Sequence, residues 1–170
     1  MKGMFVNSDG IKYAEAIVGR FKTIETRNRN TLGPLVGERV AVVRTGRGKC
    51  PMVIGDVFVV SAQPMGRDGF EIYRDWTLIP PGSKYDCPEG GKKWMYFLAQ
   101  AEACEPYPLP ANAVRHGRSW CEWDGAEEEY PFEEEYVDPG EREYIRSVTG
   151  GDYGPGNPWA APGMSARDFI

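Results

Sequence analysis

The stretch Gly19-Arg-Phe-Lys-Thr-Ile-Glu-Thr-Arg27 lies between a predicted helix and a predicted strand. Before it, apolar residues recur at the spacing of one helix face, at Ile11, Ala14, Ile17 and Val18. Gly19 is typical of a helix end. Side chains alternate along a strand, so Thr23, Glu25 and Arg27 are expected on one face. The stretch therefore predicts a turn from helix to strand that carries charged groups.

Three of these groups, Lys22, Glu25 and Arg27, have complementary chemistry. Arg27 can bind a phosphate or carboxylate in a bidentate fork. Glu25 can accept a hydrogen bond from the exocyclic amine of a base, or take up a proton. Lys22 can bind phosphate, and desolvation would lower its pKa and make it a better base or nucleophile. The alternative is an exposed, ion-paired edge strand whose charges discourage aggregation.

The rest of the chain predicts a mostly β fold of the α+β class. Its 170 residues favour one domain, and 21 Gly and 14 Pro favour many turns and short strands. With one N-terminal helix and no βαβ alternation, we expect a small antiparallel barrel with that helix packed beside it. A loop is expected over 80–92. About six short strands are expected, and the candidate segments are 3–6, Thr23–Arg27, 40–45, 52–61, 70–79, 94–104 and 119–123.

Charge divides the chain into two parts. Residues 1–121 hold 17 Lys and Arg against 12 Asp and Glu, whereas residues 122–170 hold 3 against 13. We expect a barrel domain over 1–123 and an extension over 124–170 that is first acidic and then rich in Gly and Pro. The extension could fold over a basic cleft, bind a protein partner, or only keep the chain soluble.

Several classes of protein are not expected. No run of about 18 apolar residues predicts a membrane span, and residues 1–7 lack the apolar core of a signal peptide. The expected location is cytoplasmic. None of the four cysteines forms a C-x-x-C pair and His116 is the single histidine, so neither a metal site nor a cofactor is expected.

Residues 3–123 resemble the ASCH domain family, which belongs to the PUA-like superfold of small RNA-associated barrels. Its hallmark is a helix followed by Gly-x-Lys-x-x-Glu-x-Arg, which Gly19, Lys22, Glu25 and Arg27 match with one extra residue after the glycine. Weaker matches follow at residues 36–43, 53–59, 94–98, 106–110 and 117–120. The resemblance implies a PUA-like β-barrel whose polar cleft, between helix and barrel, suits a nucleotide or base.

Some members of the family are amidohydrolases acting on N4-acetylcytidine, and others are ribonucleases. The amidohydrolase pattern resembles Lys-Thr-x-Thr-x-Arg, in which the lysine and the second threonine are catalytic. Here Glu25 stands at the position of that threonine. Thr26 is predicted on the opposite strand face, so Thr23 is the candidate substitute. The predicted catalytic residues are Lys22, Glu25 and Thr23.

A nucleic-acid surface is predicted around this cluster. Basic residues that could follow a phosphate backbone are Arg27, Arg29, Arg44, Arg47 and Lys49, although loop charges are often merely solvated. Trp120 is the best candidate for stacking on an unpaired base, although a small barrel also needs aromatic core residues.

Three functions remain open. The first is a module that binds RNA or a nucleotide-like small molecule. The second is a hydrolase acting in the same cleft on a modified nucleoside or an RNA phosphodiester. The third is an interaction protein that acts through its acidic extension.

Overall fold

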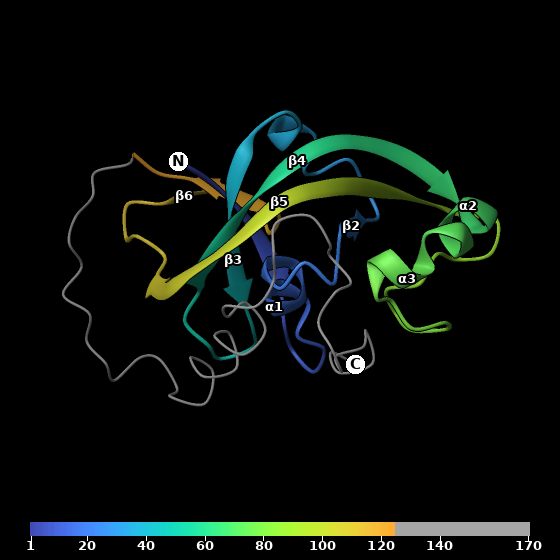
Figure 1. The fold of residues 1–170 in the computed structure, drawn as a ribbon, viewed down its shortest axis with the longest axis horizontal. Helices are drawn as coiled ribbons and strands as arrows, with labels where there is room; N and C mark the ends of the chain where they lie inside the picture. Colours follow the sequence, from blue (N-terminus) through green and yellow to red (C-terminus); the bar gives the residue numbers. More distant parts are fainter. Residues whose placement is uncertain (125–170) are drawn as a thin grey trace.

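Two long antiparallel strands dominate a computed structural model of the protein, which describes residues 1–124 (Figure 1). They are β4 (Met52–Gly66), which is rich in β-branched residues, and β5 (Lys92–Pro108), which is rich in aromatic residues, and both kinds of residue suit strands. Their register shifts at three places, and such bulges bend and twist a strand pair. The pair consequently curves along its whole length and carries two short helices at one end.

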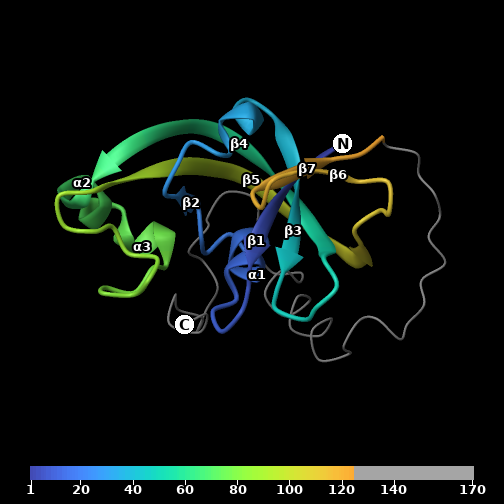
Figure 2. The ribbon, with the colours of Figure 1, turned by 180° about the vertical axis from the view of Figure 1, so that it is seen from behind.

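The sheet has seven strands in the order β2-β5-β4-β3-β1-β7-β6. All neighbours are antiparallel except β1 and β3, which are parallel. Figure 2 shows β1 between β3 and β7. The remaining strands are β1 (Lys2–Asn7), β2 (Ile24–Arg27), β3 (Arg39–Thr45), β6 (Val114–His116) and β7 (Trp120–Glu122).

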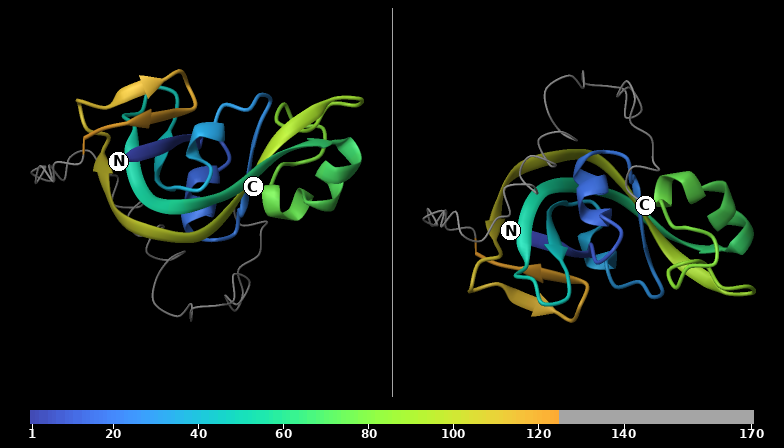
Figure 3. Two further views of the ribbon diagram at one scale, coloured as in Figure 1. Left: turned by 90° about the horizontal axis from the view of Figure 1, so that it is seen from above. Right: turned by 90° about the horizontal axis from the view of Figure 1, so that it is seen from below.

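The helices are short, and α1 (Tyr13–Val18) lies at the centre of the fold. All six of its side chains are buried, and it contacts β1, β3, β4 and β5. Figure 3 shows the sheet curving around it. The other helical segments are the 3-10 turn η1 (Gly33–Leu35), α2 (Arg67–Ile72) and α3 (Arg74–Thr77).

Strand alternation divides the apolar residues between two cores. In β3, Val40 and Val42 belong to the main core around α1, whereas Ala41 and Val43 face a smaller one on the other side. The smaller core also contains Phe5. The β1–β3 half of the sheet is therefore covered on both faces.

The predicted closed barrel is wrong, because the sheet is open and ends at β2 and β6. The described residues form seven strands. The predicted all-antiparallel sheet is also wrong, because β1 and β3 are parallel. Parallel strands need a crossover connection. Here α1 and β2 supply it between β1 and β3.

The strand expected over 70–79 is also wrong, because that segment contributes to α2 and α3. Its apolar and aromatic residues match a strand, but Arg67, Glu71 and Arg74 form ion pairs at i,i+4 and i,i+3 spacing, which favours a helix. Residues 80–91 are loop and turn, as expected.

The predicted acidic and Gly/Pro-rich extension lies outside the described residues. Within residues 1–124, the longest helices have six residues, and none could cross a membrane.

Candidate functional site

The turn after α1 carries Lys22 into the core. Arg20 takes a left-handed backbone conformation, with φ of 66°. The backbone N–H groups of Phe21 and Lys22 then both donate to the carbonyl of Ala16, which closes the end of the helix. The chain reverses within three residues, so Lys22 enters the interior just before β2 begins.

The ammonium group of Lys22 has an acceptor for each of its three protons. Nζ lies 2.7 Å from the carbonyl oxygens of both Ile24 and Thr77, and 3.3 Å from Oε2 of Glu25. Only 1% of the side chain is exposed. Burial lowers the pKa of Lys22, although the charge and hydrogen bond of Glu25 act in the opposite direction.

Glu25 and Arg27 contact each other on one face of β2, as the strand alternation predicts. Nη1 of Arg27 donates to Oε1 of Glu25, and Nη2 donates to the carbonyl of Phe5 at 2.6 Å. Glu25 thus lies between two cations, Lys22 and Arg27. We call these three residues the Lys22–Glu25–Arg27 cluster.

The cluster borders a small cavity of about 50 Å³. Strand β1, helix α1, strand β2 and the loop between α3 and β5 all contribute walls. The residues that line it are Val6, Asn7, Tyr13, Lys22, Glu25, Thr26, Arg27, Ile79 and Tyr85. We call it the β2 cavity.

Two tyrosines form the aromatic side of the β2 cavity. The rings of Tyr13 and Tyr85 meet edge to face, with centroids 6.0 Å apart, and the ammonium group of Lys22 lies 5.1 Å from the Tyr13 ring centroid. Within residues 1–124, the buried hydroxyl of Tyr13 has no hydrogen-bond partner. Burial, with the neighbouring Glu25 and Tyr85, raises the pKa of Tyr13 to about 12.

Of the two threonines beside the cluster, Thr26 is among the residues that line the β2 cavity, whereas Thr23 is not. The backbone of Thr23 joins β2 to its surroundings, donating to the carbonyl of Trp76 and accepting from the amide of Leu98. The catalytic role of Thr23 stays a prediction.

The predicted basic surface is brought together only in part. Arg44 is buried in β3, 3.6 Å from Glu15 of α1, so its prediction as an exposed phosphate contact is wrong. Strand alternation turns this residue toward the helix. The exposed residues Arg47 and Lys49 lie on the β3–β4 loop, and Arg29 is exposed after β2.

Trp120 is half-buried in β7 and already has an aromatic neighbour. Its ring stacks on His116, with centroids 3.8 Å apart and planes 13° from parallel. His116 in turn contacts Glu122 at 2.8 Å. One face of the indole is thus covered, and a base would have to displace His116 to reach that face.

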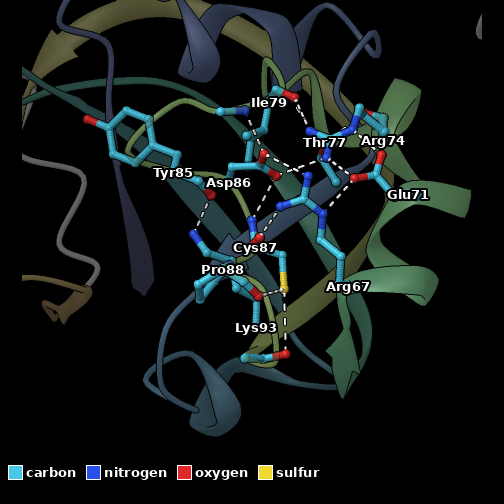
Figure 4. Close-up of polar contacts among 12 residues, drawn as sticks. Arg67, Glu71, Arg74, Thr77, Ile79, Tyr85, Asp86, Cys87, Pro88 and Lys93 are labelled. Carbon is cyan, nitrogen blue, oxygen red and sulfur yellow. Dashed lines mark hydrogen bonds and ion pairs between the residues drawn. The ribbon is translucent and has the colours of Figure 1, made fainter.

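Sequence reasoning missed an ionic network on the loop between α3 and β5 (Figure 4). Oδ1 of Asp86 accepts from Arg74 at 2.9 Å and from the Cys87 amide at 2.8 Å, while Oδ2 accepts from the Gly82 amide at 2.7 Å. Arg67 adds an ion pair with Asp86 at 3.5 Å. The network holds the segment next to Tyr85 and hence one wall of the β2 cavity.

Lys93 is a second buried lysine, and no motif in the sequence indicates it. Its Nζ donates to the carbonyl of Tyr85, and burial lowers its pKa. Among residues 1–124, no group of three His, Cys, Asp or Glu side chains is placed to hold a metal ion.

Comparisons with known proteins bear on the fold. No protein-family model and no curated protein matches the chain in sequence. Among solved structures, ASCH from Zymomonas mobilis superposes with a TM-score of 0.56 at 20% identity, covering 86% of this chain and 95% of that one. The chain has the fold of an ASCH domain.

A serine-to-alanine mutant of the same Zymomonas mobilis protein gives a TM-score of 0.56 at 18% identity, covering 86% of this chain and 96% of the other. The ASCH fold agrees with the resemblance seen in the sequence. At this level of identity the likeness concerns the arrangement of the backbone and not the chemistry of the site.

Proposed function

We propose that the β2 cavity is the binding site for a base of a nucleotide or of single-stranded RNA. The observation that carries the proposal is the ion pair of buried Glu25 and half-buried Arg27 beside two tyrosine rings. A carboxylate can accept from an exocyclic amine, a guanidinium can donate to the ring nitrogens or carbonyl oxygens of a base, and aromatic rings stack on bases. The ASCH fold, which belongs to the PUA-like superfold, supports the same ligand class.

The β2 cavity must open to admit a base. Its volume of about 50 Å³ suits water, whereas pockets for small ligands measure roughly 300–1,000 Å³. Ile79 and Tyr85 belong to a loop, while the other walls are built from β1 with its following turn, α1 and β2. Outward movement of that loop is the motion that enlarges the site, and an enclosed site favours one base over a strand passing through it.

Binding can be measured by isothermal titration calorimetry with the full chain, the four ribonucleosides and a pentauridylate. Replacing Arg27 by Ala removes the fork and is expected to weaken binding about tenfold or more. Arg27→Lys keeps the charge beside Glu25 but loses the planar fork, so it tests the same contact in a variant that retains the ion pair.

Arg39→Ala is the matched control, because Arg39 is exposed and belongs to an ion pair outside the β2 cavity. If neither nucleosides nor the pentauridylate bind the wild-type chain, the proposal fails. Equal binding by the Arg27 and Arg39 variants would also overturn it.

A hydrolase is the second candidate, with amide or RNA phosphodiester bonds as substrates. The lowered pKa of Lys22 beside Glu25 is the observation that favours it. In the ammonium form, each of the three Nζ protons of Lys22 faces an acceptor, so Lys22 could serve as a base or nucleophile only after it loses one of these protons. Product formation from N4-acetylcytidine or the pentauridylate, abolished by Lys22→Met while binding persists, would support this function.

A further inference from the structure

A second and larger hollow is also lined by the α3–β5 loop. It measures about 530 Å³, within the range typical of ligand sites. The loop supplies most of its wall, with further contributions from Asn28 after β2, Arg67 of α2 and Lys92 of β5. We call it the Lys84–Lys92 groove.

The groove has a basic lining. Arg67, Lys84 and Lys92 line it, and the single carboxylate in its wall is Asp86. That carboxylate is already engaged by Arg74 and by two backbone amides. The lysines are exposed, and within residues 1–124 neither makes an ion pair.

One wall residue offers an unused polar group. The hydroxyl of Ser83 is buried and, among residues 1–124, has no hydrogen-bond partner. A buried hydroxyl without a partner is costly, and a ligand oxygen reaching it would remove that cost. The β2 cavity has a comparable group in the hydroxyl of Tyr13.

The groove and the β2 cavity are next to each other along two segments of the chain. Arg27 lines the cavity and Asn28 the groove, while Tyr85 lines the cavity between Lys84 and Asp86 of the groove. The ammonium group of Lys84 lies 4.9 Å from the centroid of the Tyr85 ring. A ligand with a planar part in the β2 cavity and a charged part in the groove would therefore contact the α3–β5 loop at both ends, at Tyr85 and at Lys84.

We propose that the Lys84–Lys92 groove binds the phosphate groups attached to the nucleoside whose base occupies the β2 cavity. The inference rests on the proposed function and adds to it a separate site for the phosphate groups of that ligand, whether it is a free nucleotide or part of an RNA strand. Lysine ammonium groups bind phosphate as point charges, and the Ser83 hydroxyl adds a neutral hydrogen bond.

The test compares uridine, uridine 5′-monophosphate and a pentauridylate by calorimetry with the full chain. We expect each phosphorylated ligand to bind about tenfold or more tightly than uridine. The double substitution Lys84→Gln and Lys92→Gln should remove that gain and leave the affinity for uridine unchanged. The control, Arg115→Gln with Arg118→Gln, removes the same charge from exposed positions outside both sites.

The salt dependence separates the two sources of phosphate. If both lysines neutralise phosphates of an RNA strand, the slope of log K against log salt for the pentauridylate falls by about 1.4 in the double variant. If the groove takes a single terminal phosphate, the affinity for the monophosphate equals that for the pentauridylate.

Equal affinity for uridine and its phosphorylated forms would overturn the groove inference and leave the β2 cavity proposal intact. An equal loss in the double variant and its control would overturn it as well. If uridine does not bind but inorganic pyrophosphate does, and the double variant abolishes this, the β2 cavity proposal fails while the groove is retained as a phosphate site.

Discussion

Glu25→Gln is expected to destabilise the protein strongly, because Glu25 is the single carboxylate in the Lys22–Glu25–Arg27 cluster. The substitution keeps the shape of the side chain and one acceptor oxygen. It leaves the charge of Lys22 buried against two neutral carbonyls. Removing one partner of a buried ion pair lowers the free energy of unfolding by about 3–5 kcal/mol. Because one acceptor oxygen is retained, we expect a loss of about 3 kcal/mol.

The loss also has an upper bound. Lys22 can escape by releasing its proton, and from an ordinary lysine pKa near 10.4 this costs roughly 5 kcal/mol at pH 7. The free energy of unfolding should therefore fall by about 3 kcal/mol and by no more than about 5 kcal/mol. Urea unfolding of the full chain, followed by tryptophan fluorescence, measures it as a lower midpoint at unchanged slope.

Two further variants make the reasoning refutable. Glu38→Gln breaks the Lys2–Glu38 pair, whose side chains are 30% and 42% exposed, and should cost at most about 1 kcal/mol. Adding Lys22→Met to Glu25→Gln removes the stranded charge and should restore part of the stability. If Glu25→Gln costs no more than Glu38→Gln, or if the double variant is no more stable than Glu25→Gln alone, the cluster does not act as described.

Three other predictions concern the titration of Lys22, the packing of the sheet and the loop over the β2 cavity. The pKa of Lys22 is lower in the folded state than in the unfolded state, so the contribution of Lys22 to stability rises with pH up to the unfolded pKa of about 10.4. In urea titrations, the stability of the wild type relative to Lys22→Met should therefore increase between pH 7 and 10, and a constant difference would contradict this. Gly55→Ala places a Cβ 2.3 Å from a backbone oxygen of β5 and should lower the free energy of unfolding by about 3 kcal/mol, whereas Gly37→Ala, with open space and a φ of +82°, should lower it by about 1 kcal/mol. Equal losses would show that β4 and β5 move apart to accept the methyl group. Asp86→Asn weakens the loop network and should speed hydrogen exchange of the Cys87 amide about tenfold without global unfolding; unchanged exchange would mean that Asp86 does not hold the loop.

Local patterns predicted the parts of the site that depend on one strand. Strand alternation has a period of two, so it correctly placed Glu25 and Arg27 together, and the helix end before Lys22 explains how that residue reaches them. The same alternation turns Arg44 of β3 toward α1, where it lies 3.6 Å from Glu15. The strand positions of 40–45, 52–61 and 94–104 were also correct, because β-branched runs in the first two segments and an aromatic run at the start of the third favour strands.

The misses are non-local. The segment Phe70–Ile79 has strand-like composition, and its helices are stabilised by ion pairs that reach Arg67, outside the segment. Asp86 lies in a loop rich in glycine and proline, where no spacing rule indicates which side chain will meet Arg74. Closure of a barrel depends on whether β2 and β6 meet in space, and neither strand carries that information in its own residues.

The ends of the described domain are joined to each other. The backbone groups of Met1 and Trp123 exchange hydrogen bonds, and Lys2 pairs with Glu122 between β1 and β7. A short peptide could therefore connect residues 1 and 123 without stretching, and new ends could be cut in the exposed loop at residues 46–50. The same adjacency would let the domain be inserted into a surface loop of a host protein without separating β1 from β7.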